Sequence, residues 1–400
     1  MSSPNLICLH CGLLCELPGD CAKREALTNE LDQVDARHLL STDVSDAAQT
    51  LVYRIKTSDS PTLLRLDSLD VDSARSVLRF ALKSGCRVTH CGATEQQPLR
   101  EVASRHGWIS STIADAASHA DLIWLISDTA NELPLLKSRL GSKPKLIHIE
   151  LEDPAAASKE SNRTSASTGN LVRMSSSGLF WLLNSLTQTL EGSDLASTSS
   201  CEHPTQYAEQ LLLELKTARS VCIVWPASIF ADDSERFIIQ RLNTLSQQLT
   251  GPERICSLLP IGQDAGMVTS EEVMLWTTGS TEGAFVASNE FKTAFSQYDG
   301  QPNQDSGNSI FVRSLTSERP INHRQGELVI APAFDVHRLP KTPANMIGLQ
   351  VSGIDTDATL FRGDKAVTLH ISASRKPADG FSCKDLFDRA SQIWASGGQE

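Results

Sequence analysis

The stretch PTLLRLDSLDVDSARSVLRFALKSGCRVTH, residues 61–90, contains one complete repeat of strand, helix and strand. Two short apolar runs, within PTLLRLDSL and CRVTH, enclose a segment with an Asp near its start and Gly85 at its end, which are typical helix boundaries. Between them, apolar side chains recur at helical spacing: Val71, Ala74, Val77, Leu78 and Ala81. The pattern predicts a helix that joins two strands.

The same alternation continues along the chain. Helix TEQQPLREVASRHG, strand ADLIWLISD, helix NELPLLKSRLG and strand PKLIHIEL follow, and SVCIVWPAS, DSERFIIQRLNTLSQQL, ICSLLP and SEEVMLW repeat the order later. Three further apolar strands, GELVIAPAF, MIGLQVS and AVTLHIS, precede a final helix, CKDLFDRASQIWA. Continuous apolar strands separated by amphipathic helices are typical of parallel sheets covered on both faces. The sequence therefore predicts an α/β fold with two parallel-sheet units.

The domain boundaries follow from composition. The predicted division is a Cys-rich N-terminal segment over 1–50, a first α/β domain over 51–152 and a second over 207–400. Between the two domains, residues 153–206 are rich in Ser, Thr and Ala apart from one apolar helix, SSGLFWLLNSL, and are interpreted as a crossing.

Charge and cysteine usage indicate the cellular setting. The formal net charge is −12 without a Lys/Arg block, which argues against nucleic acid or an anionic membrane as the main partner. Neither a signal peptide nor a membrane-spanning run is evident. Ten cysteines spread unevenly over 400 residues indicate free thiols, so we expect a cytoplasmic protein.

The segment LICLHCGLLCELPGDC, residues 6–21, is the strongest candidate for a metal site. It places Cys8, Cys11 and Cys15 in a C-x2-C-x3-C array, with Cys21 shortly after. Three thiolates at this spacing can converge on an iron–sulfur cluster that Cys21 would complete. The alternatives are a zinc site with His10 as a ligand, and plain buried thiols.

A second candidate is the turn THCGATEQQ. Cys91 follows a predicted strand, where open parallel sheets place ligands, and could serve as a soft metal ligand. The alternative is that Cys86 fills the core and Cys91 only ends a strand. No G-x-G-x-x-G, P-loop, H-E-x-x-H or G-x-S-x-G motif is present, and no catalytic residue is assigned.

Four stretches, in order along nearly the whole chain, resemble one family. They are CLHCGLLCEL; HGWISSTIADAASHADLIWLISDTANELPLLKSRL with Pro134 and Arg139; GQDAGMVTSEEVMLWTTGS with Trp276, Thr278 and Gly279; and TLFRGDKAVTLHI with Thr359, Arg362, Asp364 and Leu369. The family is that of the B subunits of formylmethanofuran dehydrogenase and of the bacterial formyltransferase/hydrolase complex, which are relatives of molybdopterin oxidoreductases.

The resemblance implies two alternative roles in one-carbon metabolism linked to tetrahydromethanopterin. The dehydrogenase branch implies a redox subunit with a [4Fe–4S] cluster on Cys8, Cys11, Cys15 and Cys21, and a Mo- or W-bis-pterin centre near Cys91. The bacterial branch implies a scaffold for the formyl hydrolase, the formyltransferase and a C-type subunit, within a complex that oxidises formaldehyde to formate through a methanofuran-like carrier. A free-standing α/β binding protein is the third alternative.

Departures from the family pattern favour the scaffold branch. Where the dehydrogenases carry Cys-His-Gly-Pro, this sequence has His90, Cys91, Gly92 and Ala93, and Glu16-Leu17 replaces the Asp-Asp expected after the third cysteine. We therefore predict a subunit that is not itself catalytic, with no cofactor of its own and with remnant cysteines at its N-terminus.

Overall fold

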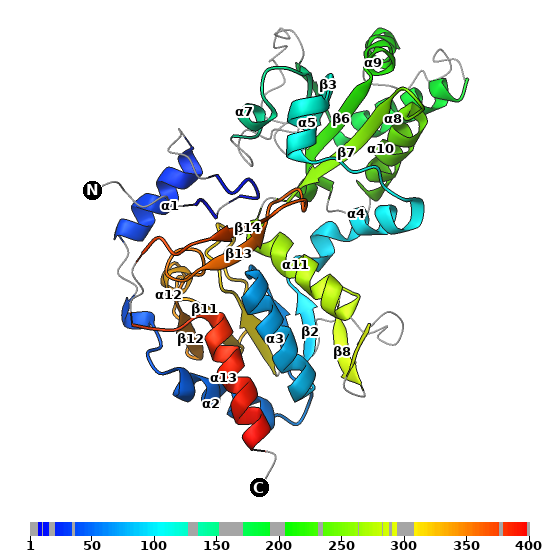
Figure 1. Cartoon of the computed structure of the whole chain (residues 1–400). Helices are drawn as coiled ribbons and strands as arrows, with labels where there is room; N and C mark the ends of the chain where they lie inside the picture. The colour runs from blue at the N-terminus through cyan, green and yellow to red at the C-terminus, as the bar shows by residue number, and fades with distance from the viewer. Residues whose placement is uncertain are drawn as a thin grey trace. The chain divides into compact units, whose positions relative to one another are not determined.

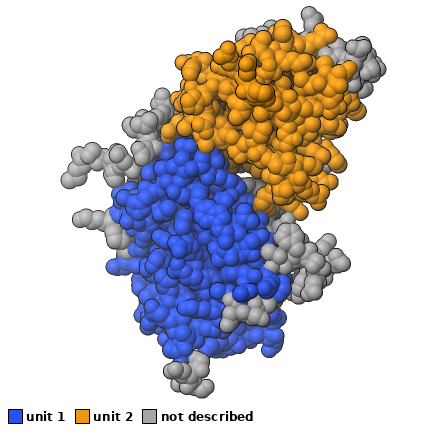
Figure 2. All heavy atoms as spheres, turned by 45° about the vertical axis from the view of Figure 1, so that its right-hand side comes forward, with its two compact units in different colours: residues 1–93, 264–400 blue, residues 94–263 orange. Residues whose placement is uncertain are grey.

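A computed structural model describes residues 7–9, 11–15, 21–33, 37–126, 135–151, 171–192, 205–230, 235–262, 264–281, 283–287, 290–293, 308–375 and 379–397. The chain divides into two compact units (Figure 2): unit 1 comprises residues 1–93 and 264–400, and unit 2 comprises residues 94–263. Each unit is built on its own sheet (Figure 1), which is parallel in unit 2 and parallel apart from its last two strands in unit 1.

Unit 1 contains a seven-stranded sheet in the order β12-β11-β10-β1-β2-β8-β9. The strands are β1 (Leu63–Leu66), β2 (Arg87–His90), β8 (Ala284–Ala287), β9 (Glu290–Thr293), β10 (Ser309–Val312), β11 (Leu328–Pro332) and β12 (Met346–Leu349). The first five strands in that order are parallel, whereas β8 runs antiparallel to β2 and β9 antiparallel to β8.

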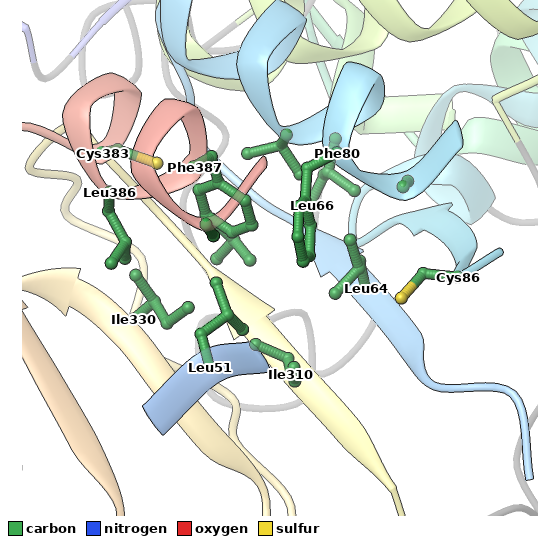
Figure 3. Close-up of a cluster of buried hydrophobic side chains, with 14 of the residues drawn as sticks. Leu51, Leu64, Leu66, Phe80, Cys86, Ile310, Ile330, Cys383, Leu386 and Phe387 are labelled. Carbon is green, nitrogen blue, oxygen red and sulfur yellow. The ribbon is translucent and has the colours of Figure 1, made fainter. Parts of the chain in front are cut away.

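The core of unit 1 lies between the sheet and helices α2 (Val44–Lys56), α3 (Val71–Ser84), α11 (Ala265–Thr278) and α13 (Cys383–Ser396). Figure 3 shows Leu64 and Leu66 of β1 pointing toward Phe80 of α3 and Phe387 of α13. Helix α3 confirms the prediction from residues 61–90, because Asp70 caps its first turn and Gly85, at φ 73°, ends it in the left-handed conformation.

The remaining elements of unit 1 are α1 (Ala22–Gln33), η1 (Arg37–Leu39), α12 (Ala333–His337) and a hairpin of β13 (Ala358–Phe361) and β14 (Thr368–Ile371). The Cys-rich segment joins this unit directly. The Gly363 N–H donates to the Gly12 carbonyl oxygen over 2.6 Å, and Leu9 and Leu14 lie in an apolar cluster with Ile354 and Leu360.

Unit 2 has a fully parallel sheet in the order β5-β4-β3-β6-β7. Its strands are β3 (Leu122–Ile126), β4 (Lys145–Leu151), β5 (Leu171–Met174), β6 (Ser220–Pro226) and β7 (Ile255–Ile261). The helices are α4 (Ala93–His106), α5 (Ile113–His119), α7 (Leu136–Leu140), α8 (Ser176–Leu190), α9 (Thr205–Thr217), η3 (Ala227–Phe230) and α10 (Arg236–Leu249). Trp124, Trp225 and Phe230 are fully buried in its core.

The predicted fold class of two parallel-sheet α/β units is confirmed, but the units differ from the predicted domain boundaries. Strand β1 pairs with β10, so residues near 65 and near 310 belong to one sheet. The chain leaves unit 1 after β2, builds unit 2 and returns at Asp264. The region 153–206, interpreted as a crossing, contributes β5 and α8 to unit 2. A local pattern identifies strands, but it does not identify which distant strands pair.

Within the described ranges, every helix is too short or too polar to cross a lipid bilayer.

The edge strand β12 provides a direct test of the fold. A Cβ on Gly348 would overlap the Leu39 carbonyl oxygen, and the segment there is held by the Ser41 N–H, which donates to the Gly348 carbonyl over 3.0 Å. We expect Gly348→Ala to lower the free energy of unfolding by about 1–3 kcal/mol, as overpacking does. Chemical denaturation measures the change. Gly251→Ala is the control, because a Cβ at Gly251 would meet nothing within 4 Å; equal stability of the two variants would contradict the contact.

Candidate functional site

The candidate site is the edge of the unit 1 sheet where its parallel strands end. In open parallel sheets, ligands bind at this edge because the strands' carboxyl ends and the following loops meet there. Polar side chains follow four neighbouring strands of unit 1, and we call this set the carboxyl edge: Asp67, Ser68 and Asp70; His90 and Cys91; Arg313, Ser314, Thr316 and Ser317; and Asp335.

Arg313, directly after β10, is the central cation of the carboxyl edge. Its side chain is only 2% exposed; its Nε donates to Asp67 Oδ2 over 2.6 Å and its Nη1 to Asp335 Oδ2 over 3.0 Å. Burial alone would lower the pKa of Arg313, but the carboxylates of Asp67 and Asp335 raise it above its usual value. The charge of the guanidinium is therefore neutralised by carboxylates of the same chain.

Asp335, on helix α12 directly after β11, completes an ion triad with Arg313 and Asp67. The Thr316 hydroxyl donates to its Oδ1 over 2.6 Å, and Arg338 Nη1 lies 3.6 Å from the same oxygen. Burial raises the pKa of the Asp335 carboxyl, while Arg313 and Thr316 oppose that rise. The triad links the loops after β1 and β10 to helix α12 by charge-assisted hydrogen bonds, which are stronger than neutral ones.

Two helices that begin at the carboxyl edge, α3 and α11, have their N-termini occupied by carboxylates. Asp70 accepts from the Ser73 N–H over 3.0 Å at the start of α3, and from the Ser314 hydroxyl over 2.8 Å. Asp264 accepts from the Met267 N–H over 3.0 Å at the start of α11, and from the Ser317 hydroxyl over 2.5 Å. Helix N-termini bind anions through free N–H groups and the helix dipole. Here a phosphate or pyrophosphate would have to displace an Asp from each helix.

His90, at the end of β2, is held in one orientation. The Gly92 N–H donates to its Nδ1 over 3.2 Å, so the neutral ring carries its proton on Nε2, which lies 2.8 Å from the Ser270 hydroxyl. Ser270 in turn donates to the Asp67 carbonyl over 2.6 Å. A serine nucleophile needs the opposite hydrogen-bond direction, in which the serine hydroxyl donates to the imidazole and the imidazole accepts its proton. The pair is therefore arranged to fix the loop after β1 rather than to activate Ser270.

Cys91 lies at the same edge, on the other side of β2 from His90. Its N–H donates to the Leu66 carbonyl over 2.7 Å, and its side chain is partly buried against an apolar cluster that includes Phe311. Burial, and then the negative charge of Asp67, raise the pKa of the Cys91 thiol to about 12. Cys91 therefore stays a protonated thiol at neutral pH, and its role as a metal ligand stays a prediction.

The N-terminal cysteines Cys8, Cys11, Cys15 and Cys21 are all buried. The Cys8 N–H donates to the Cys15 carbonyl over 3.3 Å, which closes the loop, and burial raises the pKa of Cys11 to about 12. Among the residues that the structure describes, no three His, Cys, Asp or Glu side chains are arranged to hold a metal ion. In this arrangement the thiols do not form a ligand set, and a cluster on them stays a prediction. His10 lies outside the described residues.

Two of the stretches that carried the family resemblance meet in space, although they are far apart in sequence. Trp276 of α11 packs edge-on against Phe361 of β13, with 5.1 Å between ring centroids, and the Phe361 N–H donates to Thr269 Oγ1 over 2.8 Å. Lys365, in the turn after β13, lies 2.7 Å from Glu272 of α11. These residues clamp the β13–β14 hairpin onto α11. Of the other matched residues, Arg139 lies on α7, and Pro134 is outside the described residues.

The ion triad was not predicted from the sequence. A signal was present, because Asp67 and Arg313 each directly follow an apolar run, and charged residues at strand ends are typical of the ligand edge. The strand before Arg313, SIFV, is only four residues long and follows a polar loop, so its pattern is too short to stand out.

Comparison with known proteins gives a match in fold. No family model matches the sequence, and no curated protein matches it. The fold is similar to that of a chain in the X-ray crystal structure of the formyltransferase/hydrolase complex from Methylorubrum extorquens, determined in complex with methylofuran. The match has a TM-score of 0.70 and covers 90% of this chain and 98% of that chain, at 16% sequence identity. The two chains share a fold over nearly their full lengths, as the resemblance in sequence predicts.

Removal of the central cation tests the triad. Arg313→Met would leave Asp67 and Asp335 buried without their cation, and we expect a loss of about 3–5 kcal/mol of unfolding free energy at pH 7. An unpaired buried carboxyl has a folded-state pKa above its unfolded value. The folded variant therefore binds more protons than the unfolded chain, and the loss should shrink as pH falls from 7 toward 5. Urea denaturation at both pH values measures it.

Lys384→Met is the matched control, because it removes the exposed pair of Lys384 with Asp388, which are 2.9 Å apart. An exposed pair contributes less than about 1 kcal/mol. If Arg313→Met cost no more than this control, the triad would not be a structural constraint.

Proposed function

We propose that this chain is a non-catalytic B-type subunit of a formyltransferase/hydrolase complex that acts in tetrahydromethanopterin-linked oxidation of formaldehyde to formate. Its partners would be the formyl hydrolase, the formyltransferase and a C-type subunit, in the cytoplasm. The shared fold with a chain of such a complex supports the assignment, as do the four stretches in family order. The chain's own task would be to brace its partners.

One observation favours the scaffold over the redox subunit: the carboxyl edge is closed by its own side chains. Arg313 is neutralised by two carboxylates, and Asp70 and Asp264 occupy the N-termini of α3 and α11. Each pterin of a bis-pterin centre carries an anionic phosphate, which needs free cations or free N–H groups. The residues present at this edge do not fit such a group.

The N-terminal cysteines have a structural role in this proposal. Cys8, Cys11 and Cys15 are buried beside Leu9 and Leu14, and buried free cysteines behave as small hydrophobic residues. They would hold the first segment against the β13–β14 hairpin. The redox alternative instead requires these thiols to be deprotonated and metal-bound.

Co-purification separates a member of a complex from a free-standing binding protein. We expect a tagged full-length chain, expressed in its native host, to retain three other polypeptides in fixed ratio through size-exclusion chromatography, with formyl hydrolysis in the same fractions. A chain that elutes alone, with the activity elsewhere, would reject the proposal.

Substitution of the N-terminal cysteines separates the scaffold from the redox subunit. We expect a Cys8→Ser/Cys11→Ser variant to keep the activity of the assembled complex and to lose only about 1–3 kcal/mol of stability per buried hydroxyl. Cys256→Ser, at an equally buried thiol of unit 2, is the control for that cost. Loss of iron together with activity in the N-terminal variant alone would support the redox alternative.

A further inference from the structure

Strand β9 ends the unit 1 sheet on the side opposite β12. It pairs antiparallel with β8 on its inner side, with Val286 opposite Phe291 and Phe285 opposite Lys292. Within the described ranges, no strand pairs with its outer side. The backbone N–H and C=O groups on such an edge are available to another strand.

The charges along β9 are arranged symmetrically about Phe291. Glu290 and Lys292 flank it, with side chains 72% and 52% exposed, and they pair with each other within the strand, with 3.1 Å between Glu290 Oε2 and Lys292 Nζ. Phe291 lies partly buried against the core of unit 1. The order is therefore anion, aromatic ring, cation. A second copy of the strand that runs antiparallel therefore has the opposite charge at each position that flanks Phe291.

We infer that β9 is the contact strand of a symmetric pair of copies of this chain, joined antiparallel edge to edge about a two-fold axis at Phe291. That axis places Glu290 of each copy opposite Lys292 of the other, which gives two pairs of opposite charges. It also keeps the core faces of both sheets on the same side, since opposite residues in an antiparallel pair share a face. One two-fold rotation thus pairs the outer backbone groups of β9 and gives each charge a second opposite charge besides its partner within the strand, as a self-complementary isologous contact requires.

The apolar side chains next to this edge fit the same arrangement. Phe291 of each copy would meet its counterpart across the axis, which continues the apolar core from one unit to the next.

Alternative pairings satisfy the charges less well. An axis midway between residues 291 and 292 would set Phe291 opposite Lys292 and turn the core face of one copy to the opposite side of the joined sheet. Of these two axes, only the one at Phe291 pairs opposite charges and like faces together. A contact strand of four residues is short, so the association is expected to be weak and dependent on concentration.

A charge swap tests the inference. The full-length chain, and the complex if partners co-purify, is examined by sedimentation velocity over a range of concentrations, and copies per particle are counted by native mass spectrometry. We expect two copies per particle. The dissociation constant should be about tenfold higher for Glu290→Lys and for Lys292→Glu, because each single reversal places like charges opposite each other at two positions across the axis. The double variant again sets opposite charges across the axis and should restore the wild-type dissociation constant.

Lys145→Glu is the control, since Lys145 belongs to unit 2, where it pairs with Glu214. Thermal unfolding of all variants checks folding, and the exposed positions of Glu290 and Lys292 predict little change. A single copy per particle at every concentration would overturn the inference and would make Lys292 a charge that keeps the edge from pairing. A dimer indifferent to both single reversals, or not restored by the double variant, would equally overturn it.

Discussion

The ion triad of Arg313 with Asp67 and Asp335 is the constraint on which the rest of unit 1 depends. The loop after β1, the loop after β10 and helix α12 meet at one buried guanidinium. Around it, Ser314 reaches the cap of α3 and Ser317 reaches the cap of α11, so the two helices are positioned by the same loop after β10. A buried charge network of this kind contributes less to net stability than to fixing one arrangement, because each partner would be costly to leave unpaired.

That constraint also determines what the carboxyl edge can do. In an open parallel sheet this edge is where cations and helix N-termini receive anionic ligands, but here Arg313 and the N-termini of α3 and α11 already have carboxylates of the same chain. His90 and Ser270 add a hydrogen-bond chain that ends on the backbone of the first loop. The edge is thus organised as structure, which fits a subunit that supports others better than one that performs redox chemistry.

The sequence predicted the elements better than their assembly. Helix α3 could be predicted from its Asp, its apolar spacing and Gly85, because those signals are local. The pairing of β1 with β10 could not, since a parallel contact across more than two hundred residues leaves no periodic trace. For the site, the position of Cys91 at a strand end could be predicted from the sequence. The partnership of Arg313 with Asp335 was not, because it depends on which loops the fold brings together.

The central claim is that the carboxyl edge holds no pterin centre. The most direct measurement is pterin, molybdenum, tungsten, iron and acid-labile sulfide per chain in the complex purified without oxygen from its native host. We predict no pterin, molybdenum or tungsten, and no iron and sulfide in cubane ratio assignable to this chain. Stoichiometric pterin with molybdenum or tungsten would contradict the account, because the triad and both helix caps would then have to open to admit the cofactor.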